Sequence, residues 1–66
     1  MSTLADEYPK EQERCRELLE AYIEIGPPGQ FGASMLRQLL KRAEIAAAEQ
    51  DLLAMIQCFQ EMKDSQ

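Results

Sequence analysis

Chemistry in this 66-residue chain would have to come from two thiols, a glycine-rich loop and a set of carboxylates, because the sequence contains no histidine. Histidine is the commonest general base near neutral pH and a common metal ligand. Without it, Cys15 lacks the partner that would make it a protease-like nucleophile. Two thiols, Cys15 and Cys58, are also too few to close a tetrahedral zinc site. We therefore predict no catalytic residue, no metal site and no cofactor, and a chain that is not an enzyme.

The glycine-rich loop and the cysteine spacing point the same way. Residues 26–32 read GPPGQFG, which has neither the lysine nor the spacing of a phosphate-binding loop. The two cysteines lie far apart, inside helical patterns, and form no CxxC pair. We expect two reduced thiols rather than a disulfide. Cys15→Ser is expected to cost more stability than Cys58→Ser.

The charge and hydropathy of the chain restrict its partners. Twelve acidic residues against seven basic ones give a formal net charge of −5. This balance argues against binding to nucleic acid or to an anionic membrane, since both require lysine and arginine. No apolar run approaches the ~18 residues that span a bilayer, and the acidic start lacks the basic and apolar regions of a secretion signal. The sequence predicts a cytoplasmic protein that acts through protein contacts.

Three stretches with a 3.6-residue apolar period predict helices at residues 9–25, 33–49 and 52–63. Pro9 suits a first helical turn, Gly26 can end the first helix, and Asp51 can cap the start of the third. Residues 1–7 and 64–66 are expected to be frayed ends of a single domain, 1–66. The predicted fold is all-α, an antiparallel three-helix bundle. Its predicted core is Leu18, Leu19, Tyr22, Leu36, Leu39, Leu40, Ala43, Leu52, Ile56 and Phe59.

An acidic stripe is the most informative surface feature. At about 100° per residue, four carboxylates of the first predicted helix fall within about 60° of one another, opposite its apolar face: Glu13, Glu17, Glu20 and Glu24. Glu13 repels Glu17 and Glu20 repels Glu24 at i,i+4 spacing, and the last two lie toward the negative end of the helix dipole. The stripe is either the solvated back of an amphipathic helix or a face that docks on a basic protein surface. The second interpretation makes these four residues the candidate partner-binding site.

Two further features each allow a structural and a functional interpretation. If Gly32 caps the second helix, Phe31 and Leu36 occupy the positions of a hydrophobic staple. Phe31 could instead anchor a partner. The basic residues Arg37 and Lys41, with Arg42, form either a solvated face or a contact for the acidic stripe of a second copy.

The third helix is apolar over more than half of its circumference. One edge, expected at Met55, Cys58 and Met62, could exceed what a three-helix core buries. This edge is either part of a wide core face or the contact of a homodimer or partner, where methionine adapts readily to different surfaces.

Several segments resemble small uncharacterised proteins encoded by bacterial phages and prophages: Tyr8-Pro9-Lys10-Glu11, Glu17-Leu18-Leu19-Glu20, Ile25-Gly26-Pro27, Phe31-Gly32-Ala33 and Glu61-Met62-Lys63. Short acidic proteins of this origin resemble inhibitors of host defence, including anti-CRISPR proteins that occupy a DNA-binding surface. The resemblance implies an inhibitor in the bacterial host cytoplasm that covers the basic surface of a host nucleic-acid-binding complex and so acts as a DNA mimic. The alternative is a self-associating structural or regulatory protein that uses an apolar face of the third helix.

Overall fold

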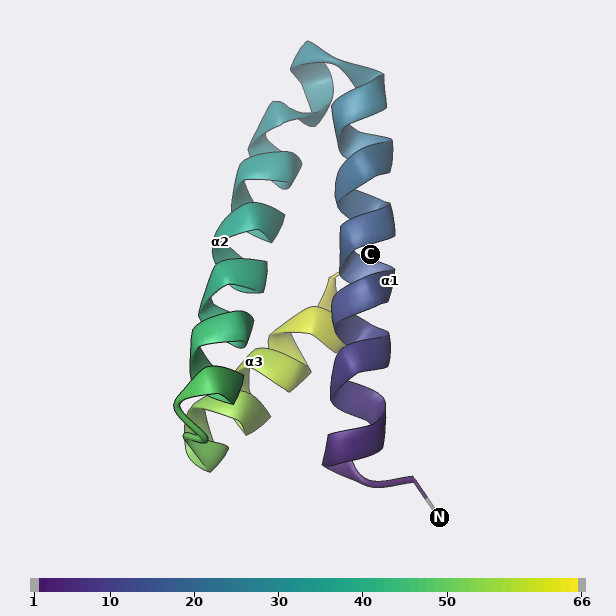
Figure 1. Cartoon of the computed structure of the whole chain (residues 1–66). Helices are drawn as coiled ribbons and strands as arrows, with labels where there is room; N and C mark the ends of the chain where they lie inside the picture. The colour runs from purple at the N-terminus through teal and green to yellow at the C-terminus, as the bar shows by residue number, and fades with distance from the viewer. Residues whose placement is uncertain (1, 66) are drawn as a thin grey trace.

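The computed structural model describes residues 2–65, and these residues form three α-helices and no strand (Figure 1). Helices α1 (Leu4–Ile25) and α2 (Gln30–Ala48) run antiparallel and are joined by one 3-10 turn, η1 (Pro27–Gly29). The shorter α3 (Leu52–Asp64) returns across only the lower half of this hairpin and ends beside the middle of α1. All three helices contact one another. The prediction of an all-α three-helix bundle is confirmed.

Two helices start earlier than predicted. Helix α1 begins at Leu4 because Thr3 caps it, its Oγ1 accepting a hydrogen bond from the Asp6 amide at 3.2 Å. Residues 4–7, expected to be frayed, are therefore helical, as is Asp64 at the other end. The predictions for Met1 and Gln66 lie outside the described residues.

The start of α2 corrects the expectation for Phe31. The cap position is Gly29 rather than Gly32, so Phe31 lies in the first turn of α2 with 78% of its surface exposed. The hydrophobic staple with Leu36 is therefore wrong, because the staple needs its first residue to precede the cap.

The break before α3 agrees with the sequence. Asp51 caps the helix through Oδ1, which accepts a hydrogen bond from the Ala54 amide at 3.2 Å. Gln50 completes the tight turn with a φ of 55°, in the left-handed region. The predicted cap at Asp51 is confirmed.

The core lies between α1 and α2 and is closed by α3. Its buried apolar residues are Tyr8, Cys15, Ala33, Leu36, Leu39, Ala43, Ala46, Cys58 and Met62. Five predicted core residues pack partly buried against this cluster: Leu18, Leu19, Tyr22, Leu40 and Phe59. Two predictions on α3 are wrong, since Leu52 is 62% exposed and Ile56 is 42% exposed.

Helix α3 is thus turned about its axis relative to the prediction. The edge at Met55, Cys58 and Met62, for which the sequence allowed a wide core face or a partner contact, belongs to the core: Cys58 and Met62 are buried, and Met55 packs against the core. The apolar arc of α3 is too wide for hydrophobic periodicity to specify its inward side. Contacts at its C-terminal end with Arg14 and Cys15 of α1 specify the rotation instead.

Candidate functional site

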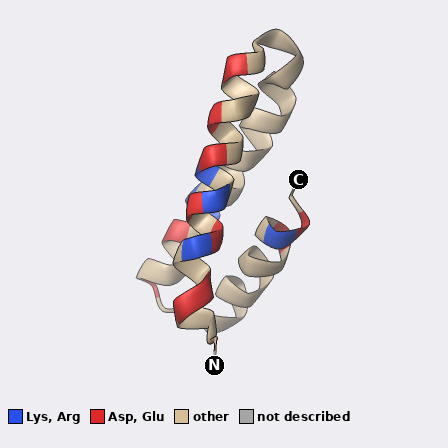
Figure 2. Cartoon of the chain, turned by 90° about the vertical axis from the view of Figure 1, so that its right-hand side faces the viewer, with Lys and Arg blue, Asp and Glu red and all other residues tan. Residues whose placement is uncertain are grey.

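The acidic stripe lies on the outer face of α1, away from the other two helices (Figure 2). All four of its carboxylates, Glu13, Glu17, Glu20 and Glu24, belong to exposed residues. Their helical spacing is the one that the sequence predicted, because α1 runs without a break from Leu4 to Ile25. The stripe is therefore accessible along its whole length.

The two halves of the stripe differ in how their charge is compensated. Glu13 is paired with Arg16 across 3.0 Å, one turn along the helix. Beyond Arg16, α1 carries acidic residues and no basic ones, as the upper part of the helix in Figure 2 shows. Within residues 2–65, Glu17, Glu20 and Glu24 form no ion pair. The uncompensated charge is concentrated at the end of α1 that leads into η1.

Exposed apolar side chains surround this end of the hairpin. Ile23 and Ile25 are about half exposed, although they are large and aliphatic. Ile23 and Phe31 also line a shallow hollow with Pro27 over the turn between α1 and α2. The alternative interpretation of Phe31 as a partner anchor fits this exposure, because buried aromatic anchors dominate many protein interfaces.

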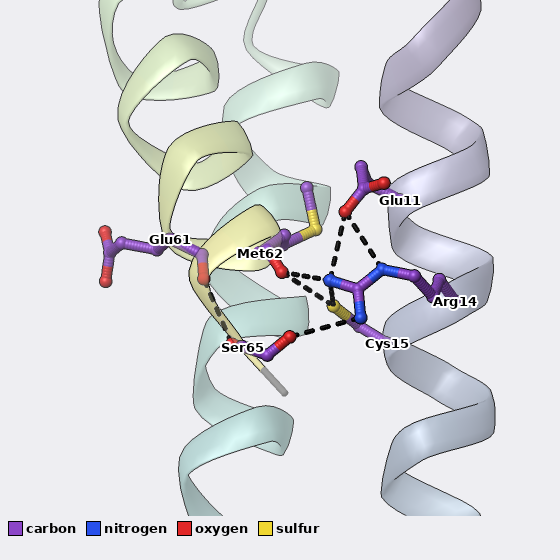
Figure 3. Close-up of polar contacts among 6 residues, drawn as sticks. All are labelled: Glu11, Arg14, Cys15, Glu61, Met62 and Ser65. Carbon is purple, nitrogen blue, oxygen red and sulfur yellow. Dashed lines mark hydrogen bonds and ion pairs between the residues drawn. The ribbon is translucent and has the colours of Figure 1, made fainter.

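Arg14 has a structural position that the sequence pattern did not indicate. Its guanidinium donates to the carbonyl oxygens of Met62 and Ser65 at the end of α3, the latter at 3.1 Å (Figure 3). Glu11 holds the same guanidinium at 3.1 Å. Carbonyls at the last turn of a helix lack intrahelical partners and carry the negative end of the dipole. Arg14 therefore caps α3 from α1 and does not belong to the stripe.

Arg14→Met should lower the free energy of unfolding by about 1–2 kcal/mol, since charge-assisted hydrogen bonds to helix-terminal carbonyls are lost while the aliphatic stem is kept. Arg16→Met is the matched control and should change it by less than about 0.5 kcal/mol, because Arg16 makes only an exposed ion pair with Glu13. Urea denaturation followed by circular dichroism measures both. Equal losses in the two variants would contradict the capping role.

The two thiols are free, as predicted, and both are buried. Cys15 donates weakly from its Sγ to the Met62 carbonyl oxygen at 3.7 Å. Burial raises the pKa of both Cys15 and Cys58; nearby Arg14 and Arg42, respectively, lower it to a smaller extent. Burial also raises the pKa of Tyr8, whose hydroxyl donates to the Ala43 carbonyl at 2.7 Å. Raised thiol pKa values disfavour nucleophilic chemistry. Because Cys58 is buried as well as Cys15, there is no longer a reason to expect Cys58→Ser to cost less stability than Cys15→Ser.

Stability should fall in alkaline solution. Because the folded pKa values of Cys15 and Cys58 lie above the ordinary value, their contribution is fully present below about pH 8.5 and decreases as the pH rises through the folded values. Urea titrations between pH 7 and pH 10 should show this decrease, and Cys15→Ala with Cys58→Ala should flatten it. Native thiols that react with a disulfide reagent as fast as in urea would refute the burial.

One basic residue of α2 forms an ion pair with α3. Arg42 forms two hydrogen bonds to the Glu61 carboxylate, at 3.1 and 2.6 Å. This pair lowers the pKa of Glu61 and raises that of Arg42. Arg42 is exposed like Arg37 and Lys41, so the solvated face expected on α2 agrees with the structure, and Arg42 forms an exposed ion pair within it.

Within residues 2–65, no three side chains of histidine, cysteine, aspartate or glutamate gather where they could hold a metal ion. None of the helices in this range combines the length and apolar character that crossing a bilayer requires.

No protein-family model matches the chain. Neither the curated proteins nor the solved structures give a match.

Proposed function

We propose that this chain is a small protein-binding inhibitor whose acidic stripe occupies a basic protein surface. The observation that carries the proposal is the row of exposed carboxylates at Glu17, Glu20 and Glu24, which have no ion-pair partner among residues 2–65. Their mutual repulsion, and the position of Glu20 and Glu24 toward the C-terminal end of α1, give no gain in folding. A basic partner would relieve both.

The spacing of the charges limits how much of a nucleic acid the stripe can imitate. From Glu13 to Glu24 the stripe spans about 16 Å along the helix axis. Duplex DNA carries a charge every ~1.7 Å of its axis, so the stripe can imitate only a short stretch of backbone. A nucleic-acid-binding surface of a bacterial defence complex, which the resemblance to phage proteins implies, is the partner that we propose.

The test is capture from bacterial lysate on the immobilised chain, at 0.1 and 0.5 M salt and with added duplex DNA. Raising the salt shortens the screening length from about 10 Å to about 4–5 Å, so electrostatic capture should weaken strongly. Nucleic-acid-binding proteins should be retained at low salt and released by the duplex. Capture that survives both treatments would contradict the proposal.

A second function, self-association, is favoured by a different observation. Leu52, Leu53 and Ile56 form an exposed apolar face on the outer side of α3. This face replaces the predicted edge at Met55, Cys58 and Met62, which is buried or partly buried. Sedimentation of the wild type and of Leu52→Lys with Ile56→Lys tests the alternative, which requires a dimer that dissociates in the double variant.

A further inference from the structure

An apolar groove continues between α1 and α2 beyond the end of α3. Met62, fully buried, fills the lower part of the interhelical groove. Above the end of α3 the hairpin has no third layer (Figure 1). There the groove is open and has a volume of about 330 Å³. It is lined mainly by Leu18, Tyr22, Met35, Leu36 and Leu39.

The exposed area of the chain agrees with an uncovered face. Its accessible surface is 4770 Å². A compact monomer of 7.5 kDa exposes about 4,250 Å² by the scaling of area with mass. Two large apolar residues of the upper hairpin contribute to the excess, since Ile25 is 58% exposed and Met35 is 53% exposed.

The charges around the groove indicate the chemistry of its occupant. Of the charged lining residues, Arg42 and Glu61 neutralise each other, which leaves Asp64 unpaired. On α1, helical geometry places Glu17 about 100° and Glu24 about 120° around the helix axis from Leu18 of the groove wall, so both lie outside the groove on the side of the small Ala21. The groove thus has an apolar floor, a polar end at Arg42, Glu61 and Asp64, and acidic residues outside its α1 edge.

We propose that this groove binds an amphipathic α-helix of a partner protein, whose apolar side chains enter the groove while lysine or arginine on its edge meets Glu17 and Glu24. This inference rests on the proposed function and specifies how the basic partner is held. The lining residues span positions 18–22 of α1 and 32–42 of α2. These spans are ~6 Å and ~15 Å of helix axis, the length of one to three turns of a docked helix. A second copy of this chain fits less well, because the net charge of −5 and the glutamates outside the α1 edge oppose association.

The probe is a fluorescein-labelled synthetic 18-residue peptide with leucines on one helical face and lysines along both edges. Two control peptides have the same composition in scrambled order, or glutamate in place of lysine. Fluorescence anisotropy should show saturable binding of the amphipathic lysine peptide, with at least tenfold weaker binding of both controls. Equal binding of the scrambled peptide would overturn the proposal, because it would reduce the contact to nonspecific charge attraction.

Two matched variants locate the contact. Met35→Gln and Leu53→Gln each replace an exposed apolar side chain by a neutral polar one, in the groove and on the far side of α3, respectively. Met35→Gln should weaken peptide binding at least fivefold, and Leu53→Gln should leave it unchanged. Unchanged binding in Met35→Gln, or equal losses in both, would overturn the groove.

The outcome separates this inference from the proposed function. If Glu17→Lys with Glu24→Lys abolishes lysate capture while Met35→Gln binds the peptide normally, the inhibitor function stands and the groove fails. If Met35→Gln weakens peptide binding but Glu17→Lys with Glu24→Lys does not, the groove holds the peptide by apolar contacts alone. The role proposed for the two glutamates is then overturned. Wild-type protein that sediments as a dimer, and as a monomer after Met35→Gln, would assign the groove to a second copy and overturn the proposal.

Discussion

Met62→Ala is expected to lower the free energy of unfolding by about 2–5 kcal/mol, because truncation of a fully buried side chain leaves a cavity between the helices. A domain of this size has a total stability of only about 3–10 kcal/mol, so the variant could be largely unfolded. Met62→Leu nearly preserves the volume and should cost less than about 1.5 kcal/mol. Urea denaturation at low protein concentration measures both.

Leu52→Ala is the matched control at an exposed position of α3. Since Leu52 is 62% exposed, its truncation should change the free energy of unfolding by no more than about 0.5 kcal/mol. The pair therefore tests the rotation of α3. A larger loss for Leu52→Ala than for Met62→Ala would restore the inward face that hydrophobic periodicity predicted.

Gly29→Ala should destabilise the chain by about 1–3 kcal/mol, with a larger effect if the hairpin turn cannot shift. A Cβ atom at Gly29 would overlap the backbone carbonyl of Tyr22, because η1 passes directly over the end of α1. Backbone atoms cannot move aside as a flexible side chain can. Thermal denaturation followed by circular dichroism measures the loss.

Gly32→Ala serves as the control for that prediction. A Cβ there would meet only the Tyr22 ring, at 3.2 Å, and alanine gains about 1 kcal/mol over glycine in helix propensity. The two effects should nearly cancel. If Gly32→Ala were as destabilising as Gly29→Ala, the close approach at η1 would not be the cause.

Local signals in the sequence predicted the helices and their breaks. The apolar periods of all three helices and the Asp51 cap are of this kind, since each depends on residues only a few positions apart. The start of α1 at Leu4 was missed because the Thr3 cap precedes a stretch without apolar periodicity.

Long-range contacts could not be predicted in the same way. Arg14 looks like one more charged residue of an amphipathic helix until the end of α3 is placed beside it. The rotation of α3 depends on that contact, so Leu52 and Ile56 were assigned to the core, and the place of Met62 was left open between the core and a partner contact. The uncovered groove likewise requires knowing that α3 covers only part of the hairpin.

The acidic stripe combines a feature that the sequence predicts with one that it does not. Its four carboxylates share a face because α1 is regular, and this much follows from spacing alone. Which of them are neutralised depends on side-chain geometry, since Arg16 could reach either Glu13 or Glu20 and pairs with Glu13. Glu17 and Glu24 form no ion pair among residues 2–65, so their substitution tests the binding role of the stripe most directly.

The most direct measurement is the affinity of the captured partner for two charge-matched double variants. Glu17→Lys with Glu24→Lys alters the stripe, and Glu44→Lys with Glu49→Lys alters exposed acids of the α2 region by the same net charge. With helical circular dichroism unchanged in both, we expect at least a tenfold loss of affinity in the first variant and little change in the second. Unchanged affinity in the stripe variant, or equal losses in the two, would mean that the stripe is only a solvated helix face.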